Sequence, residues 1–125
     1  MSEKSRSVVA TRVLGAVTAV YSAAPVVSPR VLAKPTRLTT SRGAVSAPVR
    51  TLVAAIGARD VAIGTAMMLA KPGGSLRAAV MTRVAADLAD AAVFGLTLPD
   101  HTARRKVAAF APCWAALCGV SGLRR

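Results

Sequence analysis

Acidic and histidine side chains are scarce in this chain, and their scarcity excludes several common kinds of active site. The 125 residues include 5 Asp and Glu and one histidine, against 17 Lys and Arg, which gives a net charge of +12. Because His101 is the single histidine, the chain has neither a metal-ligand spacing nor a Cys/His nucleophile pair. The glycine patterns that cradle phosphates in Walker and Rossmann motifs are also missing. We therefore predict no metal and no cofactor.

The chain has 2 cysteines, too few for a disulfide framework. Cys113 and Cys118 are five positions apart on one predicted helix, which places them about 140° apart around its axis. Their side chains cannot bridge each other in that arrangement. We expect both to be small core residues.

Long apolar runs dominate the chain instead, and hydrophobic residues make up 54% of it. Each of four runs approaches the roughly 20 residues that a helix needs to cross about 30 Å of hydrocarbon. We predict an all-α four-transmembrane-helix bundle, multi-pass in the cell membrane, with residues 1–125 as a single membrane domain. The expected helices cover residues 8–27, 49–70, 76–98 and 107–123.

An Ala-rich soluble helical protein is the alternative, because the runs contain more Ala and Val than Leu. The gaps between the runs favour the membrane, since prolines, paired glycines and most basic residues gather there, as in residues 71–74 and 104–106. Of the 17 basic residues, 14 lie at predicted helix ends or in loops. This distribution predicts contact with the lipid bilayer and its anionic headgroups, and no nucleic acid.

The one long connection, residues 28–48, contains three prolines and four basic residues. Two interpretations of this basic loop are open. It either lies along the headgroups and caps one mouth of the bundle, or forms a solvated basic loop.

Six ionisable residues interrupt the apolar runs, and all functional inference depends on them. Ionised groups in hydrocarbon are costly and mark functional or tightly paired sites. Three are acidic and three basic, so their charges balance if they meet. We predict one cluster near the membrane midplane, made of Asp60, Asp87, Asp90, Arg12, Arg59 and Arg83.

Helical spacing supports the cluster. Arg83, Asp87 and Asp90 are spaced i, i+4 and i+7, within about 60° of one helix face. Asp60 shares its face with two glycines, Gly57 and Gly64, which let a neighbouring backbone come close. Arg59 points about 100° away from Asp60, so we expect it to reach a different partner.

The first helix brings Arg12 above a stripe of small residues, Gly15, Ala19 and Ala23, which predicts a packed interface. The tripeptide Thr-Arg-Val occurs at residues 11–13 and again at 82–84, near the start of the first and third helices. Such a repeat is expected if the chain arose by duplication of a helical hairpin.

The third helix should not insert into a membrane alone. Each central Arg or Asp costs about 2.5 to 3.5 kcal/mol, so its three charges cost roughly 8 to 10 kcal/mol, against a few tenths per apolar residue. We therefore expect its carboxylates to be paired with arginines.

Residues 57–64, Gly-Ala-Arg-Asp-Val-Ala-Ile-Gly, followed by a charged third helix, resemble a family of small four-helix actinobacterial membrane proteins. The resemblance covers about residues 12–123, and the Gly-x-Arg-Asp-x-x-x-Gly segment is its most specific part. It implies a multi-pass membrane protein and carries no assigned activity.

The cluster can serve several roles, which the sequence leaves open. It can hold the helices in register as polar glue. It can form a site for a lipophilic small molecule, with Asp60, Asp87 and Asp90 as acid/base groups and Arg12, Arg59 and Arg83 as orienting partners, for epoxide opening, cyclisation or isomerisation. Alternatively, the chain is a proton-coupled exporter that works as a homodimer, or a structural subunit of a larger membrane assembly.

Overall fold

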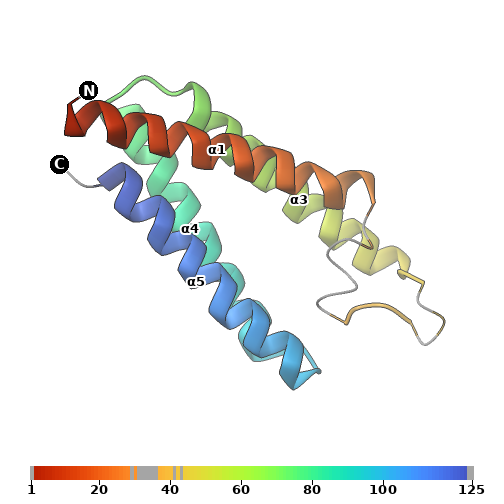
Figure 1. Ribbon diagram of the computed structural model, residues 1–125. Coiled ribbons are helices and arrows are strands. Elements are labelled where there is room, and N and C mark those ends of the chain that lie inside the picture. The colour runs from red at the N-terminus through yellow and green to blue at the C-terminus, as the bar shows by residue number, and fades with distance from the viewer. Residues whose placement is uncertain (1, 29, 31–36, 41, 43, 124–125) are drawn as a thin grey trace.

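The computed structural model describes residues 2–28, 30, 37–40, 42 and 44–123. It confirms the all-α prediction, since within these ranges the chain forms helices and a single isolated β-bridge between Thr39 and Val45. The helices keep the labels of Figure 1: α1 (Glu3–Val27), α3 (Ala47–Leu69), α4 (Gly74–Thr97) and α5 (His101–Leu123).

Two of the predicted helix starts were wrong, and capping side chains give the reason. The first helix begins at Glu3 because the Ser2 hydroxyl accepts a hydrogen bond of 3.2 Å from the Ser5 amide. Before α5, the Asp100 carboxylate accepts one of 2.8 Å from the Ala103 amide. Helix α5 therefore starts at His101 rather than at residue 107, and the basic residues 104–106 lie in its first turns instead of in a connection.

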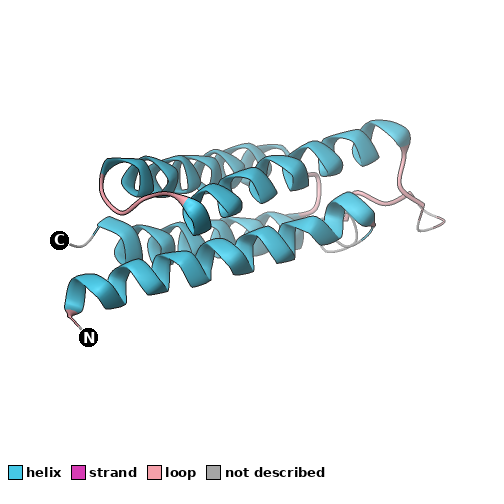
Figure 2. Ribbon diagram, turned by 90° about the horizontal axis from the view of Figure 1, so that it is seen from above, coloured by secondary structure: helices cyan, strands magenta, loops and turns pink. Residues whose placement is uncertain are grey.

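The four helices form two hairpins. Helix α1 lies along α3, and α4 lies along α5 (Figures 1 and 2). The two pairs approach each other at the end where α1 begins and α5 ends, and they diverge toward the opposite end (Figure 1). We call the first end the closed half and the second the open half.

Glycines set the distance between α1 and α3. A Cβ atom placed on Gly64 would lie 2.6 Å from the carbonyl oxygen of Gly15, and one on Gly57 would lie 2.9 Å from that of Ser22. Real Cβ atoms do not come that close to backbone, so only glycine permits this approach. The predicted small-residue interface on both helices is thereby confirmed.

The closed half is filled by apolar side chains. Val80 of α4, Met67 of α3 and Cys118 of α5 are buried there and form one cluster with Ala79. Hydrogen bonds tie α1 to α5 in the same region: the Ser7 hydroxyl donates to the carbonyl oxygen of Ser121. Cys113 is exposed, so the expectation of a core position holds for Cys118 alone.

On α1, the side chains that face outward are more apolar than the side chains that face the interior of the bundle. Thr11, Thr18 and Ser22 are buried, whereas Val13 and Val20 are exposed. A helix in water would turn these faces the other way, because its apolar stripe is the one that packs. Sixteen large apolar side chains are exposed over the described chain, as on a lipid-facing surface.

Three helices, α1, α3 and α5, are long and apolar enough to cross a membrane. Helix α4 is not among these three. Its charged side chains exclude it, because Arg77, Arg83, Asp87 and Asp90 interrupt a single helix of 24 residues. Membrane crossing by α4 therefore depends on how those charges are paired.

Candidate functional site

Five of the six predicted charged residues meet between the hairpins. They alternate in sign in the order Asp87, Arg83, Asp60, Arg59 and Asp90, and we call them the charged chain. Asp60 and Arg59 come from α3, and the other three come from one face of α4. The i, i+4, i+7 spacing on α4 thus does place its three charges on one face, as predicted.

The buried end of the charged chain is the pair of Arg83 and Asp87. Arg83 Nε donates a hydrogen bond of 2.9 Å to one carboxylate oxygen of Asp87, and Arg83 Nη2 donates to the other. Such two-point pairing fixes both side chains in one geometry. The Asp87 side chain is 3% exposed, which makes it the most buried carboxylate of the charged chain.

Asp60 joins the two halves of the charged chain. Its Oδ1 accepts a 2.9 Å hydrogen bond from Arg59 Nε, and its Oδ2 lies 3.2 Å from Arg83 Nη1. The second contact is an ion pair without hydrogen-bond alignment. Among the described residues, Arg83 Nη1 therefore lacks a hydrogen-bond acceptor although it is fully buried.

The accessible end of the charged chain is the pair of Arg59 and Asp90. Arg59 Nη1 and Nη2 donate to the two carboxylate oxygens of Asp90 over 2.9 and 2.6 Å. Arg59 does reach a partner on another helix, as predicted. Arg59 thus reaches a partner that Asp60 does not contact, and its Nε also donates to Asp60 itself.

Arg12 does not belong to the cluster, which corrects the prediction of six members. It is exposed on α1 and forms no ion pair among the described residues. The rotation of α1 explains this, because the neighbouring Thr11 faces the interior. The predicted balance of three charges against three was also wrong: the charged chain has three carboxylates and two guanidinium groups.

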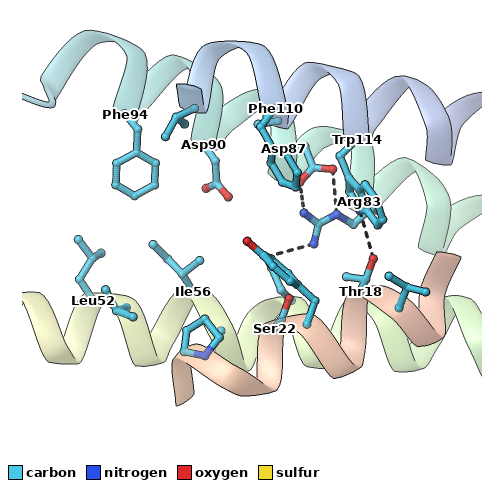
Figure 3. Close-up of a pocket in the computed structure, with 18 of the residues that line it drawn as sticks. Thr18, Ser22, Leu52, Ile56, Arg83, Asp87, Asp90, Phe94, Phe110 and Trp114 are labelled. Atoms are coloured by element: carbon cyan, nitrogen blue, oxygen red, sulfur yellow. Dashed lines mark hydrogen bonds and ion pairs between the residues drawn. The ribbon is translucent and has the colours of Figure 1, made fainter. Parts of the chain in front are cut away.

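A cavity of about 320 Å³ lies next to the charged chain in the open half. Asp60, Asp87, Asp90 and Arg83 line one side of it, and the rest of the wall is mostly apolar. Figure 3 shows the Asp90 carboxylate and the Arg83 guanidinium reaching from α4 into the space that Leu52 and Ile56 of α3 face from the other side. All four helices contribute to the wall.

Every aromatic residue of the chain lines this cavity. The sequence has two phenylalanines, one tyrosine and one tryptophan, and the wall includes Phe94, Phe110, Tyr21 and Trp114. The rings of Phe110 and Trp114 stack with centroids 6.1 Å apart, and the Trp114 indole N–H donates a 3.2 Å hydrogen bond to Thr18 of α1. Sequence analysis missed these residues. The sequence signal that could have found them is their position along the helices. Because neighbouring helices run in opposite directions, the four aromatic residues come to lie in the same half of the bundle.

Part of the basic loop reaches the open half. Leu38 lines the cavity, and Arg37 forms an ion pair of 3.4 Å with Asp100, in the turn between α4 and α5. Residues 37–40 are therefore consistent with a cap over the mouth. Residues 29, 31–36, 41 and 43 of the predicted loop lie outside the described part of the chain.

Comparison with known proteins found no match to this chain among family models, curated proteins or solved structures. Functional inference therefore depends on the site alone. The site can bind a molecule that is mostly apolar, can present carboxylates and one guanidinium to it, and has no group of three potential metal ligands among the described residues.

Proposed function

We propose that this chain is a multi-pass membrane protein whose open half binds a lipophilic small molecule beside the charged chain. The observation that carries the proposal is the convergence of all four aromatic residues and four charged-chain members on one cavity. A largely apolar cavity with a few convergent polar groups is the usual form of a small-molecule site. The aromatic wall would hold the ligand, and the charged groups would orient it.

The lipid bilayer is the proposed surrounding of the bundle. Its exposed Val and Leu side chains and its buried hydroxyls fit hydrocarbon on the outside. We propose that α4 crosses as a fourth span, because Arg59 and Arg83 pair with both of its cluster carboxylates, Asp90 and Asp87, and lower the cost of burying them. The basic residues at the helix ends would contact anionic headgroups.

Reporter fusions test whether α4, the helix with the most charged residues in its apolar run, crosses the membrane. Fusions after Gly73 and after His101 flank α4, so they should report opposite sides of the membrane if α4 crosses. A fusion after Thr40 should agree with the one after His101. The same side for Gly73 and His101 would contradict a fourth span.

The resemblance of residues 57–64 to the actinobacterial membrane family stays a prediction. Each residue that defines the segment has a physical role in this chain: Gly57 and Gly64 permit the approach of α1, and Arg59 and Asp60 belong to the charged chain. Homodimerisation, an exporter role and assembly with a larger complex stay predictions as well.

Fluorescence of Trp114 tests the small-molecule site directly, because this residue is the single tryptophan and lines the cavity. A neutral, branched alkyl ester of benzoic acid is a suitable probe, since it is lipophilic and carries no charge. We expect saturable quenching. Ala111→Phe fills the cavity from α5 and should weaken binding about tenfold or more, whereas Ala116→Phe on the exposed side of the same helix should leave it unchanged. Quenching that never saturates, or that Ala111→Phe does not weaken, would refute the site.

Acid/base catalysis is a second candidate function, favoured by one observation. Three carboxylates and two guanidinium groups meet beside the cavity, so the site presents proton-transfer groups and orienting cations to the same ligand. Asp90→Asn preserves the shape of the group but cannot exchange a proton. If the protein turns over its ligand, this variant should fold and, at saturating ligand, convert it at least about a hundredfold more slowly.

A further inference from the structure

The charge of the site carries information about the ligand beyond its being lipophilic. With all five members ionised, the charged chain has three negative and two positive groups, a surplus of one negative charge. Arg12, the one further charged residue predicted to join, is exposed and forms no ion pair in the described part of the chain. An uncompensated charge beside an apolar cavity is unfavourable, and a positive group on a ligand would compensate it.

The wall of the cavity suits a positive group. Phe94, Phe110, Trp114 and Tyr21 line the same cavity as the carboxylates. Aromatic faces attract cations within about 6 Å of the ring centroid, and the attraction is strongest where water is excluded. Carboxylates and aromatic rings therefore favour the same ligand chemistry from different sides.

A second, independent feature is an unsatisfied donor. Arg83 is 5% exposed and lines the cavity, and its buried Nη1, which lies 3.2 Å from Asp60 Oδ2 in an ion pair, has no aligned hydrogen-bond acceptor among the described residues. Buried donors are nearly always satisfied, and leaving one without an acceptor is costly. A ligand with an acceptor oxygen would complete this group.

We infer that the ligand is a lipophilic amine with a hydrogen-bond acceptor near its nitrogen, bound so that the protonated amine balances the surplus carboxylate and the acceptor meets the Arg83 guanidinium group. The inference rests on the proposed small-molecule site and names its ligand class. The amine lies toward Asp60 and Asp90, and its apolar part lies among the aromatic rings.

Three matched probes test the inference through Trp114 fluorescence on the full chain in detergent. Diethylaminoethyl benzoate has both the amine and the ester acceptor. Its neutral analogue has a CH group in place of the nitrogen. Diethyl(phenylbutyl)amine keeps the amine but lacks the ester. We expect the amino ester to bind about tenfold more tightly than either analogue, the difference that one charge-assisted contact contributes.

Asp90→Asn tests the origin of the preference, because it removes the surplus negative charge at the more accessible end of the charged chain. The amino ester should lose about tenfold in affinity, and its neutral analogue should be unaffected. Glu3→Gln is the matched control, since it removes one negative charge at an exposed position at the start of α1, away from the cavity. It should leave both affinities unchanged.

The outcomes separate this inference from the proposed site. If the neutral analogue binds the wild-type protein as tightly as the amino ester, the site stands and the amine inference is wrong. If diethyl(phenylbutyl)amine equals the amino ester, the acceptor at Arg83 is wrong. If none of the three probes quenches Trp114 saturably, both the site and the inference fail. These comparisons use the wild-type protein, so they hold even if Asp90→Asn does not fold.

Discussion

The closed and open halves of the bundle are built from the same four helices but are held together by different interactions. In the closed half, Val80, Met67 and Cys118 fill the space between the hairpins, and polar contacts are limited to hydroxyls such as Ser7. In the open half, a cavity remains, and the contact between α3 and α4 is made by the charged chain. Close packing holds one half together, and ion pairs hold the other.

The difference teaches how a small bundle can carry a cavity without collapsing. Glycines let α1 and α3 pack backbone to backbone, which holds these two helices together. Ion pairs then bridge the two hairpins beside the cavity, from Arg59 to Asp90 and from Arg83 to Asp60. Apolar side chains in that place would draw the hairpins together and close the cavity.

Removal of the most buried carboxylate should have the largest effect on the open half. Asp87→Ala leaves Arg83 buried without its two-point partner, and we expect a loss of about 3 to 5 kcal/mol in the free energy of unfolding. Asp90→Ala should cost less, about 1 kcal/mol, because Arg59 is 36% exposed and keeps Asp60. Thermal unfolding in detergent measures both.

A double variant provides the control for this pair. Replacing Arg83 by Leu in the Asp87→Ala background removes the unpaired charge and should restore part of the lost stability. Equal losses for Asp87→Ala and Asp90→Ala, or no recovery in the double variant, would show that the burial gradient along the charged chain does not govern stability.

A smaller effect is expected from disturbing the glycine contact that joins α1 to α3. Gly64→Ala places a Cβ against the backbone of Gly15, so the helices must separate, at a cost of about 1 to 3 kcal/mol. Gly95→Ala on α4 is the matched control, since its Cβ would meet only Ala108, at 4.0 Å. That change should be neutral or stabilise α4 by up to about 1 kcal/mol. Similar melting temperatures for the two variants would count against glycine packing in this hairpin.

The smallest effect is expected at Arg12. Because its side chain is exposed and outside the charged chain, Arg12→Leu should change the free energy of unfolding by no more than about 0.5 kcal/mol. Combined with Asp87→Ala, it should give no recovery, in contrast to Arg83→Leu. Recovery by Arg12→Leu would place Arg12 beside Asp87 and would restore the prediction of a six-membered cluster.

The sequence by itself determined the helices and named the five members of the charged chain, with Arg12 added in error. Four apolar runs separated by prolines, glycines and basic residues were sufficient to predict an all-α bundle, because backbone hydrogen bonds and helical periodicity act within one segment. The i, i+4, i+7 spacing on α4 placed Arg83, Asp87 and Asp90 on one face for the same reason. Helix starts were less certain, since a single capping side chain such as Asp100 moved one start by six residues.

Tertiary structure alone decided which charges meet and where the cavity lies. The repeated tripeptide demonstrates why: in residues 11–13 the threonine is buried and Arg12 is exposed, whereas in residues 82–84 Thr82 is exposed and Arg83 is buried. Identical local sequence thus faces opposite ways, because the rotation of each helix is set by the neighbours against which it packs. One residue of helix corresponds to about 100° of rotation, so this choice removed Arg12 from the cluster and left three carboxylates with two arginines.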